Sequence, residues 1–233
     1  MSRFGRTPEQ RRHKALRRAA PGPLRDYLAQ PLPDVSTPLD DARLLAVDIE
    51  TTGLDPRSDR VLSIGWLPVD GSRVVLGGAG RAVVRDDDAA GVGQSATVHG
   101  LTDDRVADGI PLEEAVGHVL TALTGRVLLA HFARIEKDFL GAACERLWGA
   151  ELPCVVIDTF ELERRHLTRG WGDEVPAGAL RLWAARERRG LPSYRAHEAL
   201  TDALACAELY LAQRAELAAR SPRTTLTLRH LMT

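Results

Sequence analysis

Short runs of consecutive apolar residues predict the strands of this chain. Residues 44–47 have the sequence Leu-Leu-Ala-Val, which is long enough to cross a sheet and too short for a helix. Such a run is typical of a strand that is buried on both faces. The other runs of this kind lie at residues 61–67, 126–130 and 155–157. Asp70 and Gly71 predict a hairpin turn, which leads to strand segments at residues 73–76 and 82–85.

Apolar residues spaced three and four positions apart predict helices between these runs. Helices are expected at residues 111–123, 134–148, 159–165, 179–189 and 199–220. Asp158 is well placed to cap the third of them, and residues 168–178 are expected to form a loop. Because strands and helices alternate after an initial hairpin, the pattern predicts an α/β fold with a mixed central sheet flanked by helices.

The two ends of the chain differ in character from this α/β pattern. Residues 1–42 are predicted to be a basic N-terminal extension with short helices, residues 43–220 the α/β domain, and residues 221–233 a C-terminal tail. A helix is expected over residues 8–20, since Thr7 can cap it and a proline follows. Leu24, Tyr27 and Leu28 have the spacing of an apolar stripe that docks on the core. The arginines of the extension either contact nucleic acid or form a solvated surface, which is the usual state of charge runs.

Composition narrows the class of protein. A length of 233 residues, with 44% hydrophobic and 27% charged residues, is typical of a soluble globular protein with a sizeable core. No apolar run approaches the ~20 residues of a membrane span, and the N-terminus lacks the apolar region of a secretory signal. We therefore expect a cytoplasmic protein without a membrane partner. The formal net charge of -1 means that any contact with nucleic acid depends on local patches.

Two acidic residues stand at the end of the first predicted strand. Asp48 and Glu50 project together, because side chains at positions i and i+2 of a strand share a face. Adjacent carboxylates repel each other unless a positive charge lies between them. Oxygen ligands suit Mg²⁺ or Mn²⁺, so the pair is a candidate metal site. The alternative is an ordinary acidic turn after a strand.

A histidine and an aspartate five residues apart begin the last predicted helix. His197 and Asp202 converge best when the histidine lies in the preceding loop, because residues five apart on an ideal helix differ by about 140°. A histidine can accept a proton near neutral pH, which suits a general base beside a metal-binding carboxylate. Taken alone, the pair has a plainer explanation: the aspartate complements the helix N-terminus and the histidine is a surface residue.

These stretches together resemble the DEDDh group of DnaQ-like 3′–5′ exonucleases, which includes the proofreading subunit of bacterial replicative polymerase. Residues 48–53 match the motif D-x-E-T-T-G, and residues 197–202 match H-x-A-x-x-D. Residues 130–136 occupy the place of the motif A-H-N-A-x-F-D, and residues 99–102 (His-Gly-Leu-Thr) are similar to a turn of these proteins. The resemblance covers about residues 43 to 213 and implies a ribonuclease H-like fold.

The middle motif departs from the family pattern. Glu136 stands in place of an aspartate, and Phe132 in place of an asparagine. Glu136 has the same charge and one more methylene, so the resemblance assigns it the fourth carboxylate of the site. Asp138 is the other candidate, but two positions along a helix are a turn of about 200°, so only one of the two carboxylates can face the site.

The resemblance also implies the role of each site residue. Two Mg²⁺ or Mn²⁺ ions would be held by Asp48, Glu50, Glu136 and Asp202, with His197 as the catalytic base. Thr51, Thr52 and Leu54 would hold the terminal nucleotide, while His131 and Phe132 either shape the pocket or simply pack.

The function expected from this resemblance is hydrolysis of single-stranded 3′ ends to nucleoside monophosphates. DNA is favoured, because the D-x-E-T-T-G motif and the turn at residues 99–102 look more like the proofreading branch. A polymerase or repair protein is the candidate partner. Two alternatives stay open: an exoribonuclease that trims short RNA, and a non-catalytic module that binds nucleic acid or a polymerase.

Overall fold

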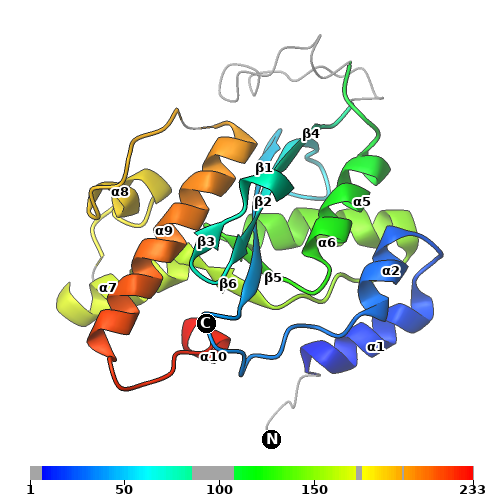
Figure 1. Ribbon diagram of the computed structural model, residues 1–233. Helices are drawn as coiled ribbons and strands as arrows, with labels where there is room; N and C mark the ends of the chain where they lie inside the picture. Colours follow the sequence, from blue (N-terminus) through cyan, green and yellow to red (C-terminus); the bar gives the residue numbers. More distant parts are fainter. Residues whose placement is uncertain (1–6, 86–107, 172–174, 196, 233) are drawn as a thin grey trace, which may run out of the picture.

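A mixed sheet lies between two layers of helices (Figure 1). The fold is that of a computed structural model, which describes residues 7–85, 108–171, 175–195 and 197–232. Within these residues the strands are β1 (Arg43–Thr51), β2 (Val61–Asp70), β3 (Arg73–Val74), β4 (Gly80–Val83), β5 (Val127–Ala130) and β6 (Val156–Asp158). The strand order is β3-β2-β1-β5-β6, and β4 also pairs with β2. β1 is antiparallel to β2 and parallel to β5, so the predicted mixed sheet is confirmed.

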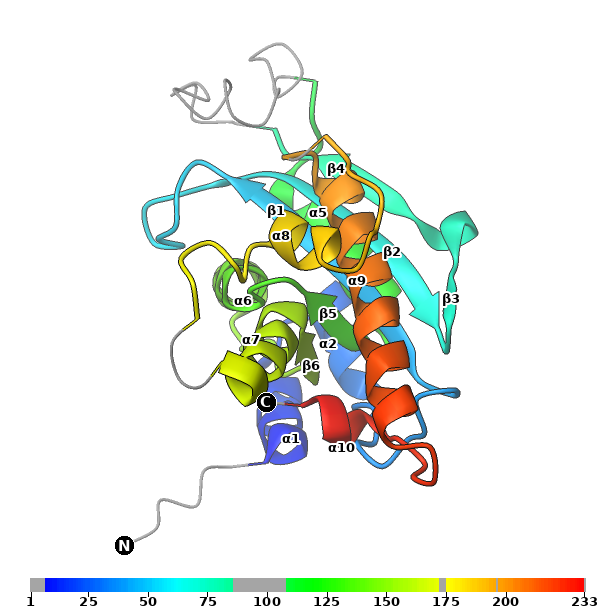
Figure 2. The ribbon, with the colours of Figure 1, turned by 90° about the vertical axis from the view of Figure 1, so that its left-hand side faces the viewer.

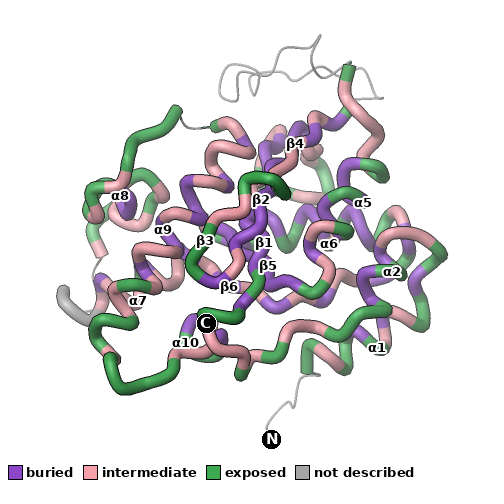
Figure 3. The backbone as a smooth tube through the Cα atoms, viewed as in Figure 1, coloured by how far each residue is buried: buried purple, intermediate pink, exposed green. Residues whose placement is uncertain are grey.

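The helices divide between the two faces of the sheet. One face is covered by α1 (Pro8–Arg18), α2 (Pro23–Ala29), α5 (Leu112–Leu123) and α6 (Arg134–Trp148). The other carries α7 (Thr159–Trp171), α8 (Leu182–Glu187), α9 (Ala199–Arg220) and α10 (Leu228–Leu231). Figure 2 shows α8 beside α9. Strands β1, β2 and β5, between the two layers, are the most buried part of the molecule (Figure 3).

Side chains of β1 alternate between these two layers. Leu45, Val47 and Ile49 pack in the cluster formed with α2, α5 and α6. Leu44 and Ala46 pack in the cluster formed with α9. Asp48 and Glu50 continue the second set, because the side-chain period of a strand is two residues. The two acidic side chains therefore lie on the α9 face of the sheet, at its edge.

The described residues near both ends of the chain pack on this layered core. Thr7 caps α1 and forms a capping box with Gln10, as its position before a proline predicts. Leu24 and Leu28 of α2 are fully buried against the helices of one layer. At the other end, the short helix α10 buries two leucines in the α9 cluster. The division of the chain at residues 43 and 220 stays a prediction.

Three predicted element boundaries are wrong. Helix α7 continues to Trp171 instead of giving way to a loop at residue 168, because an isolated glycine is tolerated inside a helix. Helix α8 begins at Leu182 instead of residue 179, since Gly178 has a φ of 79° and turns precede the helix. The third strand is only two residues long, and a 3-10 helix (Leu76–Gly78) follows it.

Two further expectations from the sequence concern a turn and membrane-spanning segments. The turn expected at residues 99–102 lies outside the described residues. In the described part of the chain, every helix is too short or too polar to cross a membrane.

The first turn of α9 rests directly on β2 at Gly65. A Cβ atom placed on Gly65 would lie 2.2 Å from the backbone nitrogen of Leu200 and 2.3 Å from the carbonyl carbon of Ala199. Gly65 is also the cross-strand partner of Asp48. The missing side chain therefore lets the start of α9, which carries Asp202, approach the acidic end of β1.

We expect Gly65→Ala to lower the free energy of unfolding by about 1–3 kcal/mol, because the added methyl group overlaps backbone atoms that cannot rotate away. Gly141 in α6 is the matched control, since a Cβ there meets nothing within 4 Å. Gly141→Ala should raise the unfolding free energy by about 0.5–1 kcal/mol, the usual gain of alanine over glycine in a helix. Urea denaturation measures both. Equal stability of Gly65→Ala and the parent would contradict the close contact.

Candidate functional site

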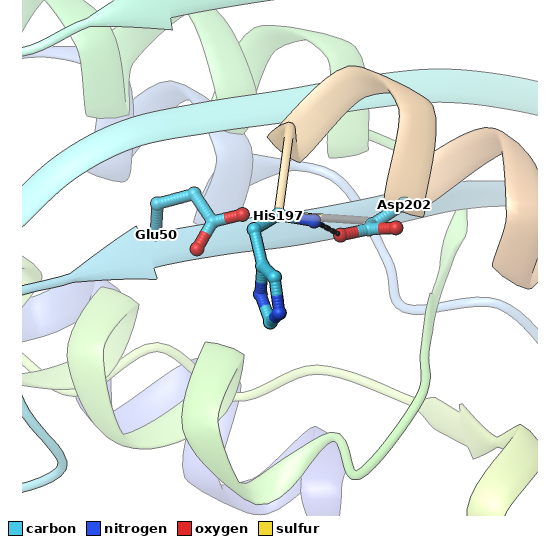
Figure 4. Close-up of side chains that lie close together, drawn as sticks. All are labelled: Glu50, His197 and Asp202. Atoms are coloured by element: carbon cyan, nitrogen blue, oxygen red, sulfur yellow. Dashed lines mark hydrogen bonds between the residues drawn. The ribbon is translucent and has the colours of Figure 1, made fainter. Parts of the chain in front are cut away.

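Three of the predicted site residues converge where β1 ends and α9 begins. Ligand atoms of Glu50, His197 and Asp202 lie within 4.8 Å of one another. Figure 4 shows Glu50 reaching from β1 toward the segment before α9, with Asp202 on the other side of His197. The backbone N–H of His197 donates to Asp202 Oδ2 at 2.7 Å. This arrangement places His197 in the loop and Asp202 in the first turn of the helix, as their spacing predicts.

Asp48 and Glu136 border this group and couple to it electrostatically. Asp48 lies two residues before Glu50 on the same face of β1, and the charges of Glu136, Glu50 and Asp202 all act on it. Glu136 lies in the first turn of α6 and is only 3% exposed. Its Oε2 is buried without a hydrogen-bond partner. Unlike the three residues above, these two do not belong to the close group found among the described residues.

The carboxyl groups of this cluster resist ionisation. Burial is the largest cause, and it raises the pKa of Glu50 to about 7 and that of Glu136 to about 8. Burial followed by repulsion from the neighbouring carboxylates raises the pKa of Asp48 well above its ordinary range. The pKa of Asp202 is raised by burial, which outweighs the hydrogen bond from His197. A buried set of mutually repelling oxygen ligands, one of them unsatisfied, fits a divalent cation.

Glu136 and Asp138, the two candidates for the fourth carboxylate, point in different directions. Asp138 is exposed on α6 and forms an ion pair with Arg134 at 3.3 Å. Glu136 is buried and faces the acidic end of β1. The two side chains point in different directions because positions two apart on a helix differ by about 200° around its axis. The structure thus brings Glu136 to the cluster and leaves Asp138 in solvent.

Backbone strain is concentrated in two of the predicted motifs. Phe132 and His197 have φ values of 68° and 66°, and they are the non-glycine residues with positive φ in the described part of the chain. Such conformations persist where surrounding interactions determine them, and they often occur at functional sites. Here a carboxylate accepts the N–H of each residue: Asp202 for His197, and Asp158 for Phe132 at 2.9 Å.

Asp158 has a wider role than the helix cap predicted for it. It caps α7 by accepting the N–H of Phe160 at 2.9 Å, as expected. It also accepts the N–H groups of Phe132 and Ala133 at the start of α6. Its charge is one cause of the raised pKa of Glu136. The second cap arises from the pairing of β5 with β6, so no local sequence signal could have indicated it.

The predicted nucleotide-binding threonines make hydrogen bonds inside their own loop. The hydroxyl of Thr51 donates to the carbonyl of Gly53. The hydroxyl of Thr52 donates to Asp59 at 3.2 Å and accepts the N–H of Arg60 at 3.0 Å. Leu54, at the tip of the loop, is 78% exposed. The apolar side chain is therefore accessible to a ligand, while the hydroxyls stabilise the turn.

His131 links three segments beside the site. Its ring nitrogens lie 2.9 Å from the hydroxyl of Thr159 and 2.9 Å from the carbonyl oxygen of Leu180. Burial lowers the pKa of His131 to about 4, so the ring is neutral at physiological pH. These contacts favour packing as its role. The ring of Phe132 lies outside this network, 43% exposed, and contacts the ring of Phe160.

A buried arginine fixes the segment that leads to His197. Arg186 of α8 is 4% exposed and donates to the carbonyl oxygens of Ala205 in α9 and Pro192 at 2.6 and 2.7 Å. It also pairs with Glu208 at 2.8 Å, and its guanidinium lies 4.8 Å from the ring centre of Tyr194. The segment before α9 is thereby attached to the helix itself. Sequence reasoning missed this residue, because nothing distinguishes it from the other arginines around it.

Glu198 is a second acidic residue that the motifs did not single out. It caps α9 by accepting the N–H of Thr201 at 2.9 Å. It also pairs with Arg81 of β4 at 2.8 Å, and its charge raises the pKa of Asp48 and of Glu50. Glutamate is not one of the residue types that usually occupy the cap position, so the sequence carried no signal for this role.

Comparison with known proteins agrees with this fold. The sequence model of the exonuclease family matches residues 45–210. The DNA polymerase III epsilon subunit of Treponema pallidum is 28% identical over 71% of this chain and 73% of its own length. The PolC-type DNA polymerase III of Thermotoga maritima is 28% identical over 73% of this chain. The chain spans only 12% of the length of that polymerase.

The same architecture occurs in solved structures. Exonuclease I of E. coli, in complex with a dT13 oligonucleotide, superposes with a TM-score of 0.64. It is 17% identical over 78% of this chain and 42% of its own. This similarity confirms the expected ribonuclease H-like fold. The chain belongs to the exonuclease family whose model covers residues 45–210.

We expect the metal-free protein to lose stability as the pH rises. The folded-state pKa values of Glu50 and Glu136, about 7 and about 8, lie above the ordinary value of 4.5. At pH values between 4.5 and these raised pKa values, the folded state binds more protons than the unfolded state. The unfolding free energy therefore falls with increasing pH over this interval. In EDTA the Tm should be higher at about pH 5.5 than at about pH 8. Mn²⁺ should raise the Tm more at the higher pH, and Glu136→Gln should flatten the profile. A Tm that rises over this interval would contradict the raised pKa values.

Arg186→Ala should reduce nuclease activity beyond its effect on stability. Losing a buried pairing partner lowers the unfolding free energy by about 3–5 kcal/mol, and misplacement of a reacting group costs up to about 10²-fold in rate. Arg189 is the matched control, because its side chain is also only 6% exposed, and it pairs with Glu163 of α7 and with Glu216 near the far end of α9. Arg189→Ala should lose a similar amount of unfolding free energy. Its kcat should equal that of the parent protein when activity is assayed well below the Tm of the variant. Equal kcat in the two variants would show that Arg186 is structural only.

Proposed function

We propose that this chain is a divalent-metal-dependent 3′–5′ exonuclease, which removes nucleoside monophosphates from single-stranded 3′ ends with DNA favoured. The observation that carries the proposal is the convergence of Asp48, Glu50, Glu136 and Asp202 with His197 at one edge of the sheet. Membership of the exonuclease family supports the reaction class. The epsilon-subunit relative and the dT13 complex of Exonuclease I support DNA as substrate.

In this proposal the four carboxylates hold the metal ions and His197 handles the proton. Bound divalent ions would supply positive charge to the phosphate and make water more acidic. His197 is exposed next to Glu50 and Asp202, where it can accept the proton of an attacking water. The hydrogen bond from its backbone to Asp202 fixes its position. Attack at phosphorus breaks the bond to the 3′ oxygen, which leaves as a hydroxyl, and releases a nucleoside 5′-monophosphate.

The terminal nucleotide would lie against the exposed apolar residues around this group. Leu54 projects from the loop after β1, and Phe132 from the turn after β5. Both can contact the face of a base, which is a contact that tolerates different base identities. A polymerase or repair partner stays part of the proposal, because the epsilon subunit and PolC-type relatives carry the name of DNA polymerase III.

The test is digestion of a 5′-labelled single-stranded DNA in the presence of Mg²⁺ or Mn²⁺. We expect stepwise shortening from the 3′ end, and loss of about 10²–10⁴ in rate for His197→Ala, the usual contribution of a general base. Asp48→Ala should abolish activity. Glu136→Gln and Asp138→Asn are a matched pair two residues apart, of which only the first should reduce the rate.

The same assay separates the alternatives. A matched RNA digested in parallel decides between DNA and RNA, and a 5′-shortened product would contradict the proposed polarity. Unchanged DNA and RNA, together with no carboxylate-dependent Mn²⁺ binding in calorimetry, would identify a non-catalytic binding module.

A further inference from the structure

A buried hydroxyl group lies opposite Glu50 in the sheet. Ser63 of β2 is the direct cross-strand partner of Glu50 in β1. Directly opposed residues of an antiparallel pair project from the same face of the sheet, with Cβ atoms about 4.5–5.5 Å apart. Ser63 therefore belongs to the α9 face, at the edge where the acidic residues lie. It is not part of any of the sequence motifs that define the proposed site.

The hydroxyl of Ser63 has no hydrogen-bond partner among the described residues. The residue is also completely enclosed, with 0% of its surface exposed. Buried hydroxyl groups nearly always have a partner, because burial removes the hydrogen bonds that they make with water. An exception next to a proposed metal site therefore points to a role in that site.

The strand register makes Glu50 the carboxylate of β1 that is closest to this hydroxyl. Asp48 is the diagonal neighbour of Ser63, and residues in that relation are roughly 7–8 Å apart. On the other side of β2, the cross-strand partner of Ser63 is Val83 of β4, whose side chain cannot accept a hydrogen bond. The apolar neighbour on one side and the carboxylate on the other direct the hydroxyl toward Glu50.

Glu198 is another carboxylate near Glu50, and its oxygens already have other roles. One oxygen pairs with Arg81 of β4 at 2.8 Å. The other accepts the N–H of Thr201 at 2.9 Å and also the hydroxyl of Thr201, as the cap of α9. These contacts hold Glu198 at the end of the helix, so Glu50 is the better acceptor for Ser63.

We infer that Ser63 is a positioning residue of the metal site, whose hydroxyl donates a hydrogen bond to the carboxylate of Glu50 when a divalent ion is bound there. The inference rests on the proposed function, in which Glu50 is a metal ligand. The hydrogen bond would restrict the rotation of the flexible glutamate side chain. Partners of this kind orient ligands and thereby increase the affinity of a site for its metal.

The test is a calorimetric titration with Mn²⁺ in the absence of nucleic acid. Ser63→Ala should raise the Kd for Mn²⁺ by about 10–100-fold, the usual effect of losing a hydrogen bond to a metal-binding side chain. In EDTA the same variant should have a Tm equal to or above that of the parent, because it removes a buried hydroxyl that has no partner in the metal-free protein. A hydroxyl with a purely structural role would instead lower the Tm in EDTA.

Tyr210→Phe is the matched control. It also removes a buried hydroxyl, about two helical turns beyond Asp202 in α9, and it should keep the Mn²⁺ affinity of the parent. DNA digestion adds a second comparison. Turnover by Ser63→Ala should fall at limiting Mn²⁺ and recover at saturating Mn²⁺. Its KM for DNA should equal that of the parent, because the enclosed Ser63 cannot touch the strand.

A Kd for Mn²⁺ equal in Ser63→Ala and the parent would overturn the inference. A clearly lower Tm of Ser63→Ala in EDTA would overturn it as well, since the hydroxyl would then have a partner in the metal-free protein. A parent protein that binds Mn²⁺ without digesting DNA or RNA would refute the exonuclease function alone, because the titration contains no nucleic acid. A parent protein that binds no Mn²⁺ would refute both.

Discussion

The whole site depends on the close contact between the first turn of α9 and strand β2. Gly65 has no side chain, so backbone meets backbone at this point. The cross-strand neighbour of Gly65 is Asp48, and the turn that rests on it leads to Asp202. Residues that are 154 positions apart in the sequence thus reach one edge of the sheet. Arg186 and Glu198 then fix the segment before α9 against the helix and against β4.

The acidic cluster that results is unfavourable by itself. Burial and mutual repulsion raise the pKa values of its carboxyl groups, and one oxygen of Glu136 has no partner. Proteins keep such arrangements where function requires them, and the remainder of the fold supplies the stability. In this chain that stability comes from the hydrophobic core on both faces of β1, whose apolar side chains are almost completely buried. A divalent cation would remove the repulsion, which is why a metal site is the simplest physical explanation of the cluster.

Sequence patterns predicted the parts of this site that depend on local geometry. The two-residue period of a strand placed Asp48 and Glu50 on one face, and the angle between helix positions separated Glu136 from Asp138. The apolar runs and stripes also located the sheet and the long helices. Gly65, Arg186 and the second cap by Asp158 could not be predicted, because each depends on elements that are distant in sequence. The boundaries of α7 and α8 were missed because glycine is both a helix breaker and a tolerated helix residue.

The departure of Phe132 from the family pattern shows how such tertiary contacts compensate a local cost. Asparagine tolerates the left-handed backbone conformation of this position, whereas other residues pay about 1–2 kcal/mol for it. Hydrogen bonds to a charged group contribute about 1.5–3 kcal/mol, and Asp158 accepts one from Phe132 and one from Ala133. The contact of the Phe132 ring with Phe160 adds about 0.5–1.5 kcal/mol. These interactions are sufficient to hold the strained turn, and the turn sets the start of α6 so that Glu136 is directed inward.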